Sequence, residues 1–120
     1  MRIEIRGRNT PITEAIRTHI EERFAARIGK QVSDLAQLEV ELLVEKNPGI
    51  STDKVAEATL HLKGVTLRAR EASSDLTHSV DLVADKLARQ VKRHRDKRRG
   101  RRDGASIRGA VPPAQPSESA

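Results

Sequence analysis

The spacing of apolar residues constrains the fold of this chain more than any other feature. Four segments alternate apolar and polar residues, which is typical of strands with one buried face; they are residues 1–7, 38–46, 54–63 and 65–71. Two further segments carry an apolar residue at every third or fourth position, as amphipathic helices do; they are residues 12–28 and 75–99. The predicted order of elements is therefore β-α-β-β-β-α.

Each predicted element has a single apolar face, and this decides how the elements pack. The simplest arrangement is an α+β domain in which two helices cover one face of a four-stranded sheet and the other face is in water. The helix between the first two strands predicts a parallel, right-handed pair, and the short connections between the last three strands predict an antiparallel meander. We expect residues 1–99 to form this domain. Residues 100–120 are basic and then rich in Pro, Ser and Ala, which predicts a flexible tail or linker.

The ends of the two predicted helices are marked less sharply than their apolar stripes. Thr10, which precedes a proline, and Thr13 are both suitable caps for the first helix. In the second helix the apolar stripe stops at Val91, yet nothing breaks the helix before Gly100. We therefore expect its last two turns to project beyond the apolar core.

Composition argues against an enzyme. The chain has no cysteine, so a disulfide framework and a Cys-based metal site are excluded, and its four histidines lack ligand spacing. It has no Gly-rich phosphate loop or nucleophile motif, so we expect no catalytic activity, metal, cofactor or small-molecule substrate. The charged, alternating N-terminus is unlike a signal peptide, and no apolar run approaches membrane-spanning length. The expected compartment is the cytoplasm.

Positive charge is concentrated at the C-terminal end. Residues 1–91 hold equal numbers of basic and acidic residues, whereas residues 92–120 hold nine Lys and Arg against three Asp and Glu, which accounts for the whole net charge of +6. A cationic end on a neutral domain predicts a polyanionic partner, nucleic acid first and an anionic membrane surface second. Phe24 is the only aromatic residue, so we expect contacts to phosphates and to shape rather than to stacked bases.

Several basic residues of the second predicted helix share one face because they are spaced three or four residues apart. These residues are Lys86, Arg89, Arg93 and Lys97. Like charges at this spacing repel and cost helix stability, which is understandable if phosphates neutralise them; a solubilising tail is the alternative. Further basic residues widen this surface, namely Lys92, Arg95 and Arg99 on the same helix and Arg23, Arg27 and Lys30 on the first. Arg17 has Glu14 or Glu21 as alternative partners.

The face of the sheet away from the helices is expected to be mixed in charge. Alternation places four glutamates on its two central strands, which are Glu39, Glu41, Glu45 and Glu57. An acidic centre without aromatic rings is a poor platform for RNA bases. Arg68 and Arg70 on the last strand contribute to a basic edge in one interpretation, and a solvated charged face is the other.

Four stretches, in this order, resemble the ribosome hibernation promoting factor family, also called protein Y. They are IEIRGRNTPITEAIR at 3–17, VEK at 44–46, ATLHLKG at 58–64 and DLTHSVDLVADKLARQVKRHRDK at 75–97. The resemblance covers about residues 1–100, and DKLARQ with the basic residues after it is its most specific part. It implies the same β-α-β-β-β-α domain, related in shape to double-stranded RNA-binding domains.

The resemblance also implies a task without catalysis. Such proteins bind the small (30S) ribosomal subunit between head and body, where messenger RNA and the A- and P-site transfer RNAs sit. They inhibit translation and preserve idle ribosomes in stationary phase or stress, and their basic surface contacts 16S ribosomal RNA mainly through phosphates. A generic double-stranded RNA-binding module is the alternative function.

Matching positions imply a set of RNA contacts on the two helices. On the second helix they are Lys86, Arg89, Lys92, Arg93, Arg95 and Lys97, and on the first helix Arg17, Arg23 and Arg27. Charge alone adds Arg98, Arg99, Arg101 and Arg102. Long members of the family carry a C-terminal domain that drives ribosome dimerisation, and GAVPPAQPSESA at 109–120 resembles the start of the linker to it. We do not expect these 120 residues to support dimerisation.

Overall fold

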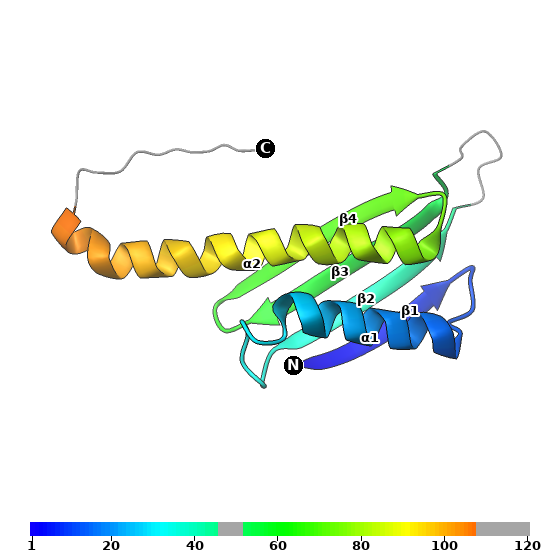
Figure 1. The fold of residues 1–120 in the computed structure, drawn as a ribbon, viewed down its shortest axis with the longest axis horizontal. Coiled ribbons are helices and arrows are strands. Elements are labelled where there is room, and N and C mark those ends of the chain that lie inside the picture. The colour runs from blue at the N-terminus through cyan, green and yellow to red at the C-terminus, as the bar shows by residue number, and fades with distance from the viewer. Residues whose placement is uncertain (46–51, 108–120) are drawn as a thin grey trace.

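The computed structural model describes residues 1–45 and 52–107, with side chains as far as Lys97. Its elements follow the predicted β-α-β-β-β-α order (Figure 1). They are β1 (Arg2–Arg8), α1 (Glu14–Ile28), β2 (Gln37–Val44), β3 (Lys54–Leu62), β4 (Val65–Ser73) and α2 (Leu76–Ile107). The predicted strands and the first helix are confirmed to within a few residues at each end.

The four strands form one sheet in the order β1-β2-β3-β4. β1 pairs with β2 in parallel, and the following pairs are antiparallel, as predicted. The tight turn between β3 and β4 depends on Gly64, whose φ of 84° lies in the left-handed region that favours glycine. This turn lies at the end of the sheet from which α2 projects (Figure 1).

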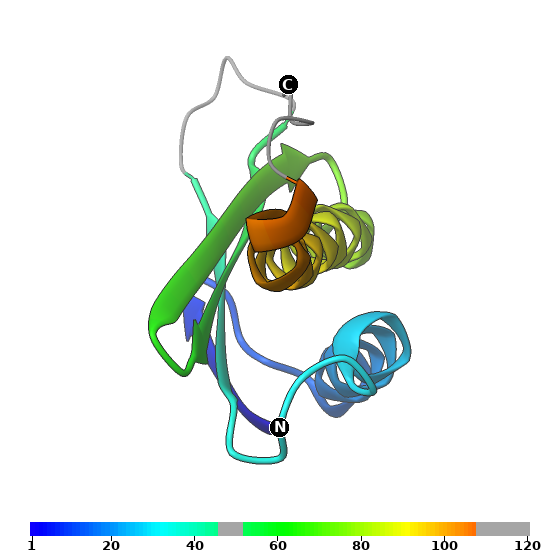
Figure 2. The same ribbon diagram turned by 90° about the vertical axis from the view of Figure 1, so that its left-hand side faces the viewer.

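Both helices pack on the same face of the sheet, as Figure 2 shows in side view. The core beneath them contains Ile20, Phe24 and Ile28 from α1 and Val80, Val83, Ala84, Leu87 and Val91 from α2, each at most 1% exposed. The sheet contributes alternate residues, including Leu38, Val40, Leu42, Ala58 and Leu60. The predicted apolar stripes are therefore the buried ones, and the only aromatic ring lies inside the core.

Caps with different chemistry begin the two helices. The Thr13 hydroxyl accepts a hydrogen bond from the Ile16 N–H at 3.2 Å, so Thr13 rather than Thr10 caps α1. The Asp75 carboxylate accepts one from the His78 N–H at 3.1 Å at the start of α2. A carboxylate at this position also favours the positive end of the helix dipole.

The second helix is longer than predicted. It continues through Gly100 to Ile107 and does not end at residue 99. A glycine costs a helix about 1 kcal/mol relative to alanine but keeps its N–H group, so it weakens the helix without the break that a proline imposes. The division into a domain of residues 1–99 and a tail stays a prediction, and it falls within a continuous helix. Residues 108–120 lie outside the described residues.

Two polar side chains attach α2 to the sheet. The buried Ser79 hydroxyl donates to the Lys54 carbonyl oxygen of β3 at 2.6 Å and lies 2.6 Å from the Ser73 hydroxyl. Closer to the projecting end, Gln90 Nε2 donates to the Arg68 carbonyl oxygen of β4 at 2.6 Å. These bonds fix which sides of α2 face β4 and α1. Neither described helix is long and apolar enough to cross a membrane.

Candidate nucleic-acid interface

The charged residues of α2 lie on two flanks, one on either side of its buried stripe. One flank faces β4, where Lys86 Nζ lies 3.2 Å from Glu71 Oε2. The other flank faces α1 and carries Asp81 and Asp85. We call them the β4-facing flank and the α1-facing flank. Their sequences both contain basic residues, but their surroundings differ.

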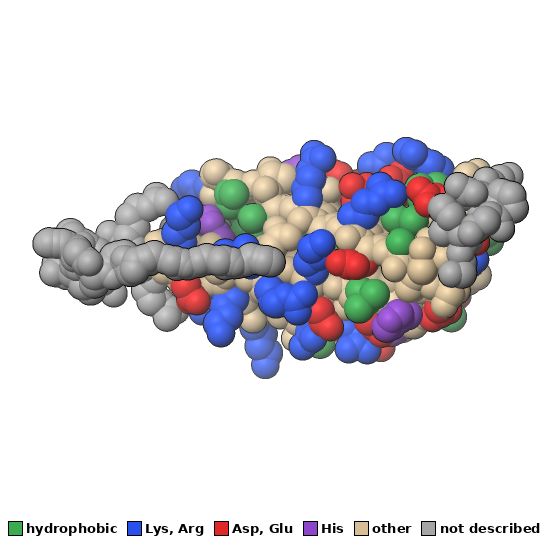
Figure 3. All heavy atoms as spheres, turned by 90° about the horizontal axis from the view of Figure 1, so that it is seen from above, with side chains coloured by type: hydrophobic (Ala, Val, Ile, Leu, Met, Phe, Trp, Pro, Cys, Tyr) green, Lys and Arg blue, Asp and Glu red, His purple; other side chains and the backbone are tan. Residues whose placement is uncertain are grey.

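The β4-facing flank forms one wall of a groove between α2 and the first half of β4. The groove has a volume of about 540 Å³. Its lining combines two apolar side chains of β4 with a polar and basic side of α2: Val65, Leu67, Lys86, Arg89, Gln90, Arg93, His94 and Lys97. In Figure 3, hydrophobic side chains are visible between Lys, Arg and His side chains toward the projecting end of α2. The structure thus brings the four predicted residues of one helix face together along one groove.

Most basic groups of this groove have no acidic partner among the side chains that the structure describes. Among the side chains described, Arg89, Arg93 and Lys97 form no ion pair, and Lys86 pairs with Glu71 alone. The three unpaired residues are exposed to solvent. Only water and counterions screen the repulsion between these three charges, so an anionic ligand would relieve it.

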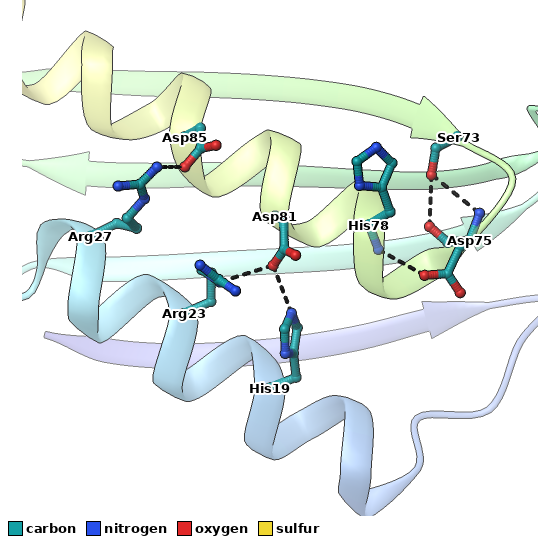
Figure 4. A network of polar contacts seen from close by, with 8 residues as sticks. All are labelled: His19, Arg23, Arg27, Ser73, Asp75, His78, Asp81 and Asp85. Carbon is teal, nitrogen blue, oxygen red and sulfur yellow. Dashed lines mark hydrogen bonds and ion pairs between the residues drawn. The ribbon is translucent and has the colours of Figure 1, made fainter.

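The α1-facing flank is neutralised by contacts between the helices (Figure 4). Asp81 Oδ1 lies 2.7 Å from His19 Nε2 and 2.9 Å from Arg23 Nε. Asp85 pairs in the same way with Arg27. Arg23 and Arg27 therefore point at carboxylates of α2 and lie away from the groove. Their assignment to an RNA-binding surface stays a prediction.

The remaining predicted residues whose side chains the structure describes fall outside the groove. Arg95 Nη1 donates to Gln31 Oε1 at 3.2 Å, which places Arg95 on the α1 side of α2, and Lys92 is exposed. Arg17 is exposed on α1 and, among the described side chains, has no ion pair with either Glu14 or Glu21. Arg98, Arg99, Arg101 and Arg102 have helical backbone, but their side chains lie outside the described ones.

The open face of the sheet neutralises much of its own charge. Ion pairs join Arg8 to Glu41 at 3.3 Å and Arg70 to Glu45 at 3.4 Å, and His61 Nε2 lies 3.5 Å from Glu39 Oε2. Arg70 is therefore paired with Glu45, the residue that follows β2. The solvated charged face is the better description of this surface. This face carries both positive and negative side chains, unlike the groove, whose charged lining residues are all basic.

Four groove residues were not identified as site residues from the sequence, and they are Val65, Leu67, Gln90 and His94. His94 lies within the basic run of α2, where the Lys and Arg residues carry the pattern. Val65 and Leu67 fit the inward alternation of β4, so their apolar pattern predicted core and nothing else. Gln90 is a single amide among many polar residues, and no pattern singles it out. Only the position of α2 over β4 shows that these side chains lie beside the basic ones.

The described residues offer little other chemistry. No group of three or more His, Asp or Glu side chains within residues 1–45 and 52–97 is placed to hold a metal ion. The hydrogen bond from Lys54 lowers the pKa of Asp53, but this pair lies at the start of β3 and does not line the groove. Among the described surfaces, the groove therefore has the charge that best suits an anionic ligand.

Comparison with known proteins identifies relatives of the whole described domain. The model of the family described as "Sigma 54 modulation protein / S30EA ribosomal protein" matches residues 3–99. The ribosome hibernation promoting factor of Salmonella typhimurium is 38% identical over 97 residues, which are 81% of this chain and 96% of that protein. The ribosome hibernation promotion factor of Picosynechococcus sp. is 32% identical over 85% of this chain, and that of Staphylococcus aureus 39% over 79%. The chain spans only about half the length of these two relatives, 53% and 48%.

Solved structures share the fold. The crystal structure of the N-terminal domain of Thermus thermophilus protein Y matches with a TM-score of 0.66 and 31% identity, covering 78% of this chain and 99% of that one. A ribosomal subunit interface protein from Coxiella burnetii matches with a TM-score of 0.65 over 80% of this chain and 99% of its own, and at 22% identity it supports the fold alone. The family match, extending over both helices and all four strands, shows that the chain belongs to the Sigma 54 modulation protein / S30EA ribosomal protein family.

Proposed function

We propose that the chain is a ribosome hibernation factor that binds the small (30S) ribosomal subunit through its 16S ribosomal RNA. It occupies the decoding channel, occludes messenger RNA and the A- and P-site transfer RNAs, and so inhibits translation while idle ribosomes are preserved under stress or in stationary phase. The observation that carries the proposal is the unpaired basic flank along the groove, on a chain of this family. Names of the relatives support the same task.

Binding alone accounts for this activity, and we propose no catalytic step. Phosphates of the RNA replace the counterions around Arg89, Arg93 and Lys97, and release of those counterions drives binding. The Ser79 and Gln90 hydrogen bonds hold α2 in place, so the basic groups need little ordering when RNA arrives. The bound chain then sterically excludes messenger RNA and transfer RNA from the channel.

The predicted contacts do not contribute equally in this proposal. The largest share belongs to Lys86, Arg89, Arg93 and Lys97 along the groove, with Lys92, Arg95, Arg98 and Arg99 as a second group on the projecting part of α2. We expect less from Arg23 and Arg27, because carboxylates already neutralise them. Arg17 completes the proposed set.

Competition on purified 30S subunits tests the proposal. Labelled full-length chain is titrated onto the subunits at fixed salt, and transfer RNA bound at the P site should displace it. Undiminished binding at saturating P-site transfer RNA would contradict the steric account. A free RNA duplex at the same salt is the control: equal affinity for the duplex and the subunit would instead favour a generic double-stranded RNA-binding module.

A further inference from the structure

We propose that the groove between α2 and β4 binds an unpaired stretch of RNA, with a base or ribose against its apolar floor and phosphates along its basic wall. The inference rests on the proposed function only in taking RNA as the ligand. It adds the class of RNA and the part of the nucleotide that each side of the groove contacts.

The floor of the groove is an unfilled part of the core face. Val65 and Leu67 are on the same side of β4 as the buried Ala69, yet both are only partly buried. Farther along β4 the apolar side of α2 covers the sheet, but the buried stripe of α2 ends at Val91. Beyond it, α2 presents polar groups such as His94 to this part of β4. Two apolar side chains therefore stay accessible beneath a basic helix.

A phosphate gains nothing from an apolar floor, whereas a base or a ribose does. The accessible Val65 and Leu67 side chains have carbon surface that stays in contact with water until an apolar group covers it. A duplex keeps its bases stacked inside, so it would place phosphates on the wall and leave this floor uncovered. Proteins that recognise unpaired RNA bind it with its bases splayed out, and a splayed base has an apolar face free to cover such a floor.

The groove also contains the groups that stack on bases in a chain with almost no aromatic residues. Phe24 is fully buried and cannot contact a ligand. Unpaired bases also stack on His rings and on Arg guanidinium planes, and the groove lining includes His94, Arg89 and Arg93. The volume of about 540 Å³ is within the range of clefts that hold small organic ligands.

Fluorescence anisotropy with the full chain tests the inference directly. Three labelled probes of equal length are compared at matched salt: a single-stranded oligouridylate, an abasic ribose-phosphate oligomer and an RNA duplex. We expect the oligouridylate to bind about tenfold more tightly than the abasic oligomer, since one stacked base contributes about that much. Equal affinities for these two probes, or tighter binding of the duplex, would overturn the inference. This comparison needs no variant and so does not depend on a variant's folding.

Variants then locate the preference. Leu67→Ser and His94→Ala should each remove most of the preference for bases and leave the salt dependence unchanged, because neither side chain releases a phosphate counterion. Thr66→Ala is the matched control for the strand, since Thr66 is the exposed neighbour on the opposite face of β4, and His78→Ala is the control for α2. Thermal denaturation checks that each variant is folded. A preference that survives in both groove variants would contradict the assignment.

Binding to 30S subunits separates this inference from the proposed function. Chain that binds subunits but shows no preference for bases would overturn the inference and leave the proposed function standing. If the chain prefers bases but does not bind subunits, the proposed function fails and the inference stands. Because the chain has no cysteine, Lys63→Cys gives a unique attachment point for a photocrosslinker, at an exposed position beside the β3–β4 turn and outside the groove lining. Crosslinks on subunits with and without messenger then show whether the unpaired nucleotides belong to ribosomal or messenger RNA, and crosslinks to paired nucleotides alone would contradict the inference.

Discussion

The two flanks of α2 differ in what surrounds them more than in the residues they carry. On the α1-facing flank, Asp81 and Asp85 of α2 pair with Arg23 and Arg27 of α1, so these basic groups hold the two helices together. On the β4-facing flank, Arg89, Arg93 and Lys97 have no carboxylate partner among the described side chains. Basic residues on a helix are therefore not equivalent: those with an internal partner support the fold, and those without one are available to a ligand.

The largest effect should come from neutralising the unpaired flank. Arg89→Gln, Arg93→Gln and Lys97→Gln together should weaken binding to 30S subunits roughly a hundredfold or more, because three phosphate contacts are lost. The slope of log affinity against log salt should fall by about 0.7–0.9 for each contact. Titration at several salt concentrations measures both quantities. The double variant Arg23→Gln, Arg27→Gln is the matched control, and an equal loss in that control would erase the distinction between the flanks.

A smaller effect on subunit binding is expected from the basic residues that follow Asp81 and Asp85 on α2, which are Lys92 and Arg95. Lys92→Gln with Arg95→Gln should weaken subunit binding about tenfold. The slope of log affinity against log salt should fall by no more than two phosphate contacts account for. The same titrations measure it. A loss as large as that of the groove variant would mean that RNA contacts both flanks of the projecting helix, and the interface would then extend beyond the groove.

Removing the aspartates of the α1-facing flank should affect stability more than binding. Asp81→Asn with Asp85→Asn should lower the free energy of unfolding by about 1 kcal/mol or less per ion pair, because the paired side chains are 31–44% exposed and solvent screens them. Urea denaturation measures this change. Subunit affinity should stay the same or rise slightly as negative charge is lost. A rise comparable to the loss in the groove variant would show that Arg23 and Arg27, once released, contact RNA.

The smallest effect is expected at the C-terminal end of the chain. Removal of residues 108–120 should change subunit affinity less than about twofold, because this segment holds one basic residue, Arg108, and one acidic residue, Glu118. Anisotropy titration of the shortened chain provides the measurement, with the full chain as control. A tenfold loss would assign a binding role to the segment that we propose to be a tail.

The sequence predicted most of the fold because the apolar spacing leaves few alternatives. The alternation of Leu38, Val40 and Leu42 and the stripe from Ile16 to Ile28 mark buried faces directly, and the structure confirms them. The end of α2 was predicted wrongly, since Gly100 disfavours a helix without stopping it. The choice between Thr10 and Thr13 also had to wait for the structure, because both are threonines and either can cap a helix.

The sequence by itself determined the elements, their order and the concentration of positive charge at the C-terminal end, since these follow from local periodicity and composition. Only the tertiary structure decided which basic residues are neutralised and which remain available. That outcome depends on partners such as Asp81 for Arg23, which are distant in the chain and meet only when α1 packs beside α2. The apolar floor of the groove has the same origin: Val65 and Leu67 stay accessible because the apolar side of α2 ends before it reaches them.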